Sequence, residues 1–246
     1  MSDGHAPARL NALGQPIGAP LPGWKGVERP PRSAMNGQYC RVEPIDPARH
    51  AEDLYKANAL EPGDRNFTYL TVGPFTSFGA YREWLTAMVG SDDPLFHAIV
   101  DLATGKAVGV ASYMRIDPAN GVIEVGGLNF SPLLQRKPAA TEAMYLMMKR
   151  AFELGYRRYE WKCDVLNAPS RAAAQRLGFS YEGIFRQATV YKGRSRDTAW
   201  YAMIDSEWPA LDRAFQRWLD PANFDAQGRQ RLRLSDLTAP ILKQRG

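Results

Sequence analysis

Residues 122–152, VIEVGGLNFSPLLQRKPAATEAMYLMMKRAF, predict a strand, a short polar turn and a helix. The strand half, 122–130, holds Gly126 and Gly127, and glycine inside a strand marks a bulge or a close approach to the backbone. The helix half begins at Pro138, because proline at the first helical position lacks only an N–H group that would have no partner there. The apolar residues of this helix recur near a 3.6-residue period: Ala139, Ala143, Leu146, Met147 and Ala151.

The turn between the strand and the helix is polar and basic, with Gln135, Arg136 and Lys137 directly before the helix. A helix N-terminus has free N–H groups and the positive end of the helix dipole. Two cations beside it make the turn a candidate anion site, and phosphate is the natural anion. The alternative is a solvated connection, because strand–turn–helix units with a basic turn are common.

The composition describes an ordinary globular chain. Its 246 residues have room for one well-packed core, and 45% of them are hydrophobic and 23% charged. No run approaches the roughly 20 apolar residues that a membrane span needs. The first 16 residues lack the basic-then-apolar pattern of a signal peptide. We therefore expect a cytoplasmic protein without a membrane partner.

Cysteine and histidine are scarce. Cys40 and Cys163 are too few for a disulfide framework, and a bridge between them is not expected in a reducing compartment. His5, His50 and His97 are scattered, and they show no metal-ligand spacing. We therefore expect no metal.

The net charge of +5 lies at the two ends of the chain. Residues 1–36 contribute about +2 and residues 226–246 about +4, so the rest is close to neutral. A basic tail can bind nucleic acid or an anionic surface. More often it is a solvated end, and here no aromatic residue is interleaved to stack on bases. We do not expect a nucleic-acid partner.

The chain divides into three parts. Residues 1–36 are rich in Pro and Gly and predict an extended N-terminal arm, which Trp24 pins to the body. Residues 37–220 predict one domain, and residues 221–246 a basic C-terminal tail. Strands are expected at 38–44, 95–102, 107–116, 122–130, 158–164, 179–189 and 197–204, and helices at 47–60, 78–89, 138–154, 168–177 and 207–219. This order implies a mixed sheet covered by helices, which is an α+β (α/β three-layer) domain.

A long loop at 62–77 turns aromatic at Phe67, Tyr69 and Phe75. Loops of this kind often line a pocket. The alternative is that the three rings cover the core.

Three short motifs follow the strand at 158–164: N-A-P-S at 167–170, L-G-F at 177–179 and E-G at 182–183. With the order of elements, they make residues 37–205 resemble the GNAT family of N-acetyltransferases, in the branch that acetylates the N-terminal amines of ribosomal proteins. The resemblance implies a GNAT-like mixed, mostly antiparallel sheet with splayed central parallel strands flanked by helices. It implies transfer of an acetyl group from acetyl-CoA to a primary amine by direct attack.

The resemblance also implies where acetyl-CoA lies. The family's phosphate loop reads Gln/Arg-x-x-Gly-x-Gly/Ala, and here it is QRKPAA at 135–140. Pro138 replaces the first glycine and removes one N–H donor, while the N–H groups that follow remain. The pantetheine arm would insert between the strands at 122–130 and 158–164. The implied contacts of acetyl-CoA are Leu128, Phe130, Gln135, Arg136, Lys137, Ala139, Ala140, Thr141, Asn167 and Ser170.

Glu124 is the candidate general base, because the amine must lose a proton and Glu124 lies on the strand beside the cleft. Strand alternation puts it on the same side as Leu128 and Phe130, unless the bulge shifts the phase. The alternative is an ion pair with a surface cation.

The tyrosine that many family members use as the acid is Ala174 here. In the ribosomal-protein branch the serine of N-x-x-S takes that role, which implies Ser170. The alternative for Ser170 is a helix cap or first-turn residue. Cys163 is interpreted as structural, because direct transfer needs no protein nucleophile.

The acceptor stays open among a protein N-terminus, a polyamine, an aminoglycoside and an amino acid. We expect its pocket to involve Phe67, Tyr69, Phe75 and Glu124. The alternative function is a catalytically silent CoA-binding protein that acts as a sensor or interaction module. A homodimer is a further expectation, supported by Trp208, Trp218 and the arm.

Overall fold

The sheet at the centre of the molecule has eight strands in the order β3-β4-β5-β6-β7-β8-β10-β9. The structure is a computed structural model and describes residues 9–246. All neighbouring pairs in the sheet are antiparallel except β7 and β8, which run parallel. The bounds are β3 Met35–Asn36, β4 Cys40–Pro44, β5 Leu95–Asp101, β6 Ala107–Asp117, β7 Val122–Phe130, β8 Arg158–Asp164, β9 Ser180–Tyr191 and β10 Arg194–Ile204. The predicted mixed, mostly antiparallel sheet is confirmed.

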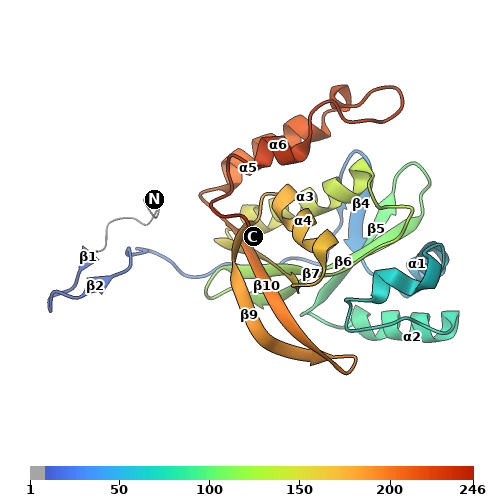
Figure 1. Cartoon of the computed structure of the whole chain (residues 1–246), viewed down its shortest axis with the longest axis horizontal. Helices are drawn as coiled ribbons and strands as arrows, with labels where there is room; N and C mark the ends of the chain where they lie inside the picture. Colours follow the sequence, from blue (N-terminus) through green and yellow to red (C-terminus); the bar gives the residue numbers. More distant parts are fainter. Residues whose placement is uncertain (1–8) are drawn as a thin grey trace.

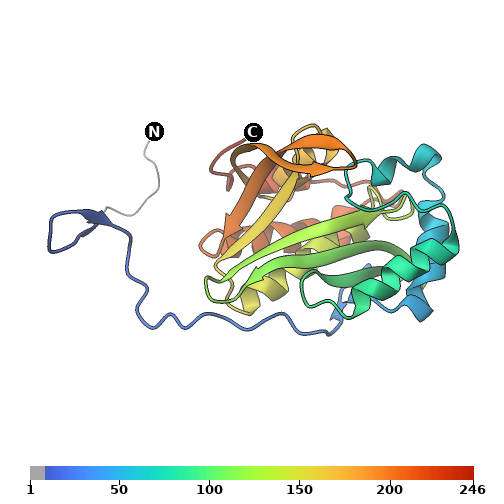
Figure 2. The same ribbon diagram turned by 90° about the horizontal axis from the view of Figure 1, so that it is seen from below.

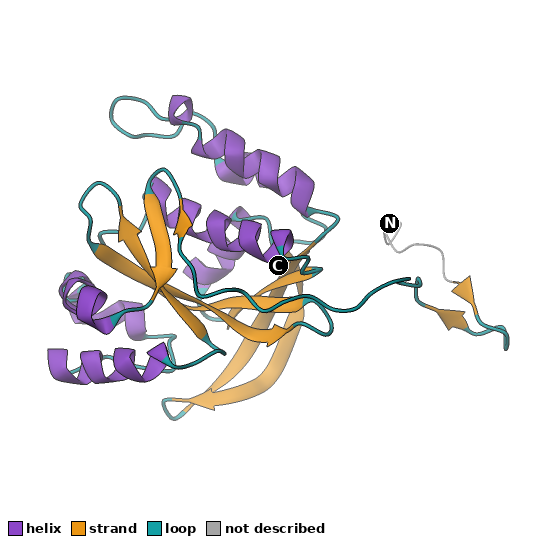
Figure 3. Ribbon diagram, turned by 180° about the vertical axis from the view of Figure 1, so that it is seen from behind, coloured by secondary structure: helices purple, strands orange, loops and turns teal. Residues whose placement is uncertain are grey.

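Helices cover both faces of this sheet (Figure 1). On one face α3, α4 and α5 pack over the larger core, and on the other α1 and α2 pack over a smaller one. The bounds are α1 Pro47–Asn58, α2 Phe78–Val89, α3 Pro138–Glu153, α4 Ala168–Arg176 and α5 Trp208–Leu219. The three-layer α/β architecture expected from the order of elements is therefore confirmed, and Figure 3 shows the helices on the two sides of the strands.

Helix α3 forms as its sequence predicts. Pro138 is its first residue, and the helix buries Ala139, Ala143, Met147 and Ala151. Leu146 is half-buried at the edge of the same face. The 3.6-residue period thus lays α3 along the larger core, with its N-terminus directly after β7 and the polar turn.

Strands β9 and β10 are longer than predicted and form a hairpin that projects from the sheet (Figure 1). The two residues of its turn, Lys192 and Gly193, have φ values of +48° and +69°. Two positive φ values in a two-residue turn match the right-handed twist of hairpin strands. The turn therefore lets pairing continue to Tyr191 and Arg194, beyond the predicted strand ends at 189 and 197.

The N-terminal arm runs along one edge of the body and then leaves it (Figures 1 and 2). Its outer part holds two short strands, β1 Arg9–Leu10 and β2 Pro16–Ile17, which the sequence did not predict. Trp24 anchors the arm, as predicted: its Nε1 donates to the carbonyl oxygen of Ala119 at 2.8 Å, and the Arg157 guanidinium lies 5.3 Å from its ring. Residues 1–8 of the predicted arm lie outside the described residues.

The C-terminal residues pack on the domain. They hold a short 3-10 turn, η2 Pro221–Asn223, and a short helix, α6 Leu234–Thr238, with Leu234 buried. Farther along, the Tyr181 N–H donates to the Gln244 carbonyl oxygen at 3.0 Å. The interpretation of residues 226–246 as a solvated end is therefore wrong, although their basic side chains are exposed.

The predicted loop at 62–77 begins with a 3-10 helix, η1 Pro62–Phe67, in which Gly63 and Asp64 have positive φ. Glycine and aspartate tolerate that conformation better than most residues, so the segment folds back tightly. Among residues 9–246, every helix is too short or too polar to span a lipid bilayer.

Candidate active site

Strands β7 and β8 pair only over their first halves. Their parallel register runs from Val122 opposite Arg158 to Val125 opposite Trp161, and it ends there although both strands continue. A cleft of about 750 Å³ opens where they part, lined by both strands, the start of α4 and residues 61–72. The expected splay of the two central parallel strands is thus present in the sheet.

A bulge in β7 lies at this point. Against β6, Asn129 is opposite Val110 and Gly126 is opposite Ser112, so Gly127 and Leu128 together oppose one residue. Gly127 has φ +59°, a value that favours glycine. The predicted interruption at the glycine pair is therefore a bulge.

The bulge changes which side chains share a face with Glu124. Beyond it, Asn129 continues the face of Glu124, while Leu128 and Phe130 pack against the larger core on the other face. The extra residue reverses the alternation, because side chains in a strand have a period of two. Glu124 therefore does not lie on the same side as Leu128 and Phe130, because the bulge shifts the phase, which was the exception attached to that expectation.

The cleft brings together about half of the predicted site residues. Those that line it are Phe67, Tyr69, Glu124, Leu128, Gln135, Asn167 and Ser170. Those outside its lining are Phe75, Phe130, Arg136, Lys137, Ala139, Ala140 and Thr141. Cys163 also lines the cleft, and burial raises the pKa of its thiol. A thiol kept protonated is a poor nucleophile, which agrees with its interpretation as structural.

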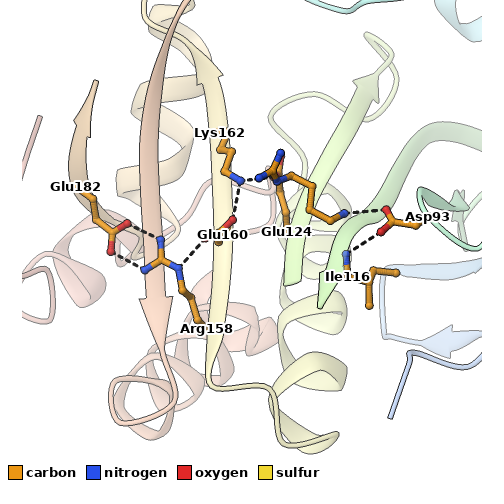
Figure 4. Close-up of polar contacts among 8 residues, drawn as sticks. Asp93, Ile116, Glu124, Arg158, Glu160, Lys162 and Glu182 are labelled. Atoms are coloured by element: carbon orange, nitrogen blue, oxygen red, sulfur yellow. Dashed lines mark hydrogen bonds and ion pairs between the residues drawn. The ribbon is translucent and has the colours of Figure 1, made fainter. Parts of the chain in front are cut away.

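Glu124 is buried and lies between two cations. Its Oε2 is 2.9 Å from Lys162 Nζ and 3.4 Å from Arg115 Nε (Figure 4). Burial raises the pKa of Glu124 above its ordinary value, and the charges of Lys162 and Arg115 act in the opposite direction. A carboxylate whose pKa is shifted toward neutrality is suited to accept a proton near pH 7.

Lys162 belongs to a row of alternating charges across β7, β8 and β9 (Figure 4). Its Nζ is 2.7 Å from Glu160 Oε2, Glu160 Oε1 is 2.7 Å from Arg158 Nε, and Arg158 Nη1 donates to Glu182 at 2.7 Å. Lys162 and Arg158 hold the pKa of Glu160 below its usual value although burial acts to raise it. The neighbouring carboxylates Glu124 and Glu160 therefore differ in their tendency to hold a proton.

Sequence reasoning missed Lys162, the closest cation to the candidate base. Its side chain is only 7% exposed, and its ammonium lies 3.7 Å from the centroid of the Trp200 ring. The alternation of Glu160 and Lys162 along one strand is visible in the sequence. Only the parallel register, which sets Glu124 beside Glu160, shows that this face meets the candidate base.

Ser170 lies in the first turn of α4. Its N–H donates to the Asn167 side chain at 3.2 Å, and its Oγ accepts a hydrogen bond from Trp161 Nε1 at 3.0 Å. Asn167 is therefore the N-cap of α4, and this bond occupies its Oδ1. Because the Ser170 oxygen accepts from Trp161, its own hydrogen remains to be donated, and the Cys163 sulfur lies within its reach.

The turn before α3 presents its cations to solvent. Arg136 and Lys137 are exposed, and Lys137 is the N-cap residue of α3. Gln135 Nε2 donates to the Phe130 carbonyl oxygen at 2.7 Å, which ties the turn to the end of β7. The Thr141 hydroxyl accepts from Arg176 at 2.8 Å. Exposed cations and a helix N-terminus at one end of the cleft suit an anion.

The aromatic loop divides between cleft and core. Phe67 and Tyr69 line the cleft, and the Tyr69 hydroxyl donates to the Leu166 carbonyl oxygen at 3.1 Å. Phe75 instead packs on Tyr81 and Trp84, with ring centroids 5.2 and 5.3 Å apart. For Phe75 the structure thus supports the alternative that the ring covers the core.

The β9–β10 hairpin closes the cleft on one side. Lys192 Nζ donates to the Phe67 carbonyl oxygen at 2.8 Å, and Arg194 Nη2 donates to that of Thr68 at 2.7 Å. The hairpin tip and the η1 segment are therefore joined. Between residues 9 and 246, no group of three or more His, Cys, Asp or Glu side chains is placed to hold a metal ion.

The sequence and the structure of this chain are similar to those of known acetyltransferases. Residues 61–179 match the model of the acetyltransferase (GNAT) family. The crystal structure of a GCN5-related N-acetyltransferase from Brucella melitensis is 48% identical, with a TM-score of 0.87, and the match covers 89% of this chain and 100% of that one. A probable GNAT-family acetyltransferase structure from Chromobacterium violaceum ATCC 12472 is 41% identical, with a TM-score of 0.74 and coverage of 80% and 98%.

A curated relative lies in the branch that the sequence motifs resemble. The ribosomal-protein-serine acetyltransferase of Escherichia coli (strain K12) is 33% identical over 105 residues, which are 42% of this chain and 58% of that protein.

Proposed function

The chain belongs to the GCN5-related N-acetyltransferase (GNAT) family, and from this premise we propose that it moves an acetyl group from acetyl-CoA to a primary amine by direct attack of the nitrogen. The observation that carries the proposal is the cleft at the β7–β8 splay, with Glu124 and Ser170 in its lining. Membership confirms the family inferred from the sequence motifs.

The cleft fits the cosubstrate at two places. Beyond Val125 the edge of β7 that faces β8 has no strand partner, so its N–H and C=O groups can pair with the amides of a pantetheine arm, as in strand addition. The turn with Arg136 and Lys137 and the N-terminus of α3 would hold the phosphates. A Cβ at Gly126 would lie 2.2 Å from Met114 Sδ, so glycine leaves room there for the Met114 side chain.

Glu124 would take the proton that the amine releases as its nitrogen forms the new bond to the acetyl carbon. The carbon–sulfur bond breaks in the same transfer, and the Ser170 hydroxyl would give its proton to the departing sulfur. Trp161 fixes the Ser170 oxygen by donating to it at 3.0 Å. Acetyl-CoA supplies the activated acetyl group, and direct transfer needs no protein nucleophile.

We further propose that the protein works in the cytoplasm on a soluble or peptide amine. Cys40 and Cys163 are both free and buried, which agrees with a reducing compartment. The Escherichia coli relative is named for a ribosomal-protein serine, so peptides belong in the first amine screen beside amino acids, polyamines and aminoglycosides.

Calorimetric titration with acetyl-CoA tests the binding half of the proposal. We expect micromolar binding, weakened about tenfold (about 1.4 kcal/mol) when Arg136 and Lys137 are both changed to Ala. A matched control changes Arg213 and Arg217 on α5 to Ala, since both are exposed cations far along the chain from the turn. Absence of acetyl-CoA binding by the intact protein would contradict both the transferase and the sensor function.

Release of free CoA with an amine panel tests the chemical half. We expect Glu124→Gln to lower kcat by about 10²–10⁴-fold, the usual contribution of a general base, while acetyl-CoA affinity is retained. Tight acetyl-CoA binding with no CoA release for any amine would favour the silent sensor instead.

A further inference from the structure

Arg196 of β10 lines the cleft with a guanidinium that has no polar partner. Its Nε is buried, and among residues 9–246 that guanidinium donates no hydrogen bond and has no carboxylate within 4.0 Å. The nearest ring is Tyr191, whose centroid is 5.9 Å from the guanidinium carbon. The side chain as a whole is half-buried, and a partly desolvated guanidinium is usually matched by a carboxylate or phosphate, because an uncompensated charge away from water is costly.

The carboxylates around Arg196 are already satisfied by other groups. Asp164 accepts from the Tyr191 hydroxyl and from the Leu166 N–H, both at 2.9 Å. Asp197 accepts from the Gln187 N–H at 2.7 Å. Glu124 is held by Lys162 and Arg115, as described above. The chain therefore leaves Arg196 as a cation that faces the cleft without a matched anion of its own.

The position of Arg196 is separate from the phosphate turn. It lies on the hairpin whose tip is joined to the η1 segment, while Arg136 and Lys137 precede α3. Trp200, four residues along β10, is opposite Lys162, the partner of Glu124. Four residues span roughly 13 Å of strand, and the register shift between Arg196 and Thr198 puts its extra residues on β9, so the spacing along β10 is kept. Arg196 therefore lies on the same side of the cleft as Glu124, and several bond lengths separate its guanidinium from the Glu124 carboxylate.

Resting on the acetyl transfer proposed above, we propose that Arg196 selects amine acceptors that carry a carboxylate several bonds from the nitrogen. The guanidinium fork matches a carboxylate with two parallel hydrogen bonds, and such charge-assisted bonds are the strong ones. An acceptor with a carboxylate would fill the vacant donors of Arg196 while its amine lies at Glu124. A polyamine, which offers only further cations, would leave them empty and add repulsion.

Two pairs of acceptors isolate the carboxylate. Alanine and alaninamide differ in the α-carboxylate, and the tripeptide amides Ala-Asp-Ala and Ala-Asn-Ala differ in a side-chain carboxylate farther from the amine. We expect kcat/KM at least tenfold higher for the acid of one pair. Because Arg196 is several bond lengths from Glu124, the peptide pair should show the larger ratio.

Variants assign the preference to Arg196. In Arg196→Gln we expect the acid and amide acceptors to become equal within about twofold, through a higher KM for the acid. Arg196→Lys should recover only part of the ratio, since lysine lacks the fork. Arg186→Gln is the matched control: Arg186 is an exposed cation on β9 of the same hairpin and does not line the cleft, and this variant should keep the full ratio.

A binding measurement separates this inference from the reaction. With CoA present, calorimetry compares N-acetylated Ala-Asp-Ala amide with its Asn counterpart, and we expect the acid to bind at least tenfold more tightly in the intact protein and equally in Arg196→Gln. If no amine is turned over, the transferase proposal fails while this comparison still decides the role of Arg196. Equal binding of the two products by the intact protein, or an unaltered preference in a folded Arg196→Gln variant, would overturn it.

Discussion

Lys162 controls the charge of the candidate base. Its ammonium touches Glu124 and Glu160 and lies on the Trp200 ring, almost out of contact with water. At short range and with little solvent screening, one charge has a large effect on a neighbour's protonation. The balance between burial, which favours protonated Glu124, and Lys162, which favours the carboxylate, therefore sets the pH range of the base.

Changing Lys162 to Met should move the acidic limb of the kcat/KM profile to higher pH. This limb follows the ionisation of Glu124. Burial raises the pKa of Glu124 and the charge of Lys162 lowers it, so removing Lys162 should raise that pKa. A full pH–rate profile measures the shift, with circular dichroism to verify folding. Lys106→Met, at an exposed position, is the control and should leave the profile in place. A limb that stays or moves to lower pH would separate Glu124 from catalysis.

Residue roles were the least predictable part from sequence. Glu124, Asn167 and Ser170 do line the cleft: the strand pattern pointed to Glu124, and the resemblance of residues 167–170 to the family's N-x-x-S motif pointed to the other two. Lys162 and Arg196 were missed, because their importance depends on neighbours across the sheet. The pairing register of the strands determines which charged side chains are neighbours, and the sequence alone does not give that register.

At the scale of elements, the bulge in β7 decides how the cleft is built. Gly127 takes φ +59°, and a Cβ there would lie 3.0 Å from Ser112 Oγ and 3.1 Å from Phe96 Cε1. From the sequence, the glycine pair predicted an irregularity in this strand. Its consequence, the exchange of faces beyond Leu128, could not be read without the register against β6.

Gly127→Ala should destabilise the fold and weaken acetyl-CoA binding. A non-glycine residue in the left-handed region costs about 1–2 kcal/mol, and the contacts with Ser112 and Phe96 add to that. Gly105→Ala is the matched control, because Gly105 has φ +70° with nothing within 4 Å of the new Cβ. Denaturant unfolding and calorimetry should give the larger loss of both quantities for Gly127→Ala. Equal losses would mean that the packing around the bulge is unimportant.

At the scale of the whole molecule, the arm is the part least attached to the rest. Between residues 9 and 23 no hydrogen bond reaches the body, and the anchors begin at Trp24. Leu10, Leu13 and Ile17 are 65%, 82% and 47% exposed. The other expected support for a dimer, Trp208 and Trp218, packs within the chain, on Phe152 and Phe224 respectively. A homodimer therefore stays a prediction that depends on the arm.

Removal of residues 1–23 should convert a dimer to a monomer and leave the domain folded. The apolar residues of the arm would be lost, while Trp24 keeps its bond to Ala119. Light scattering after size exclusion measures the mass, and circular dichroism the fold. Removal of residues 1–34 is the comparison, since it also takes away Trp24 and the Arg32–Asp92 ion pair and should lower the melting temperature. A full chain that is monomeric would end the dimer prediction.

The bulge also has a consequence for how insertions and deletions would act on this wall of the cleft. Gly127 and Leu128 together lie opposite a single residue of β6. Deletion of either one would therefore leave the side chains of Asn129 and Phe130 on their present faces of the sheet. A substitution that flattened the bulge at full length would turn both over, sending the Asn129 amide into the core and the Phe130 ring toward Glu124. Deletion of one residue at the bulge would therefore disturb the cleft less than a substitution that removes the bulge at full length. What matters at this point of β7 is whether the number of residues between Gly126 and Asn129 keeps these two positions on the same face.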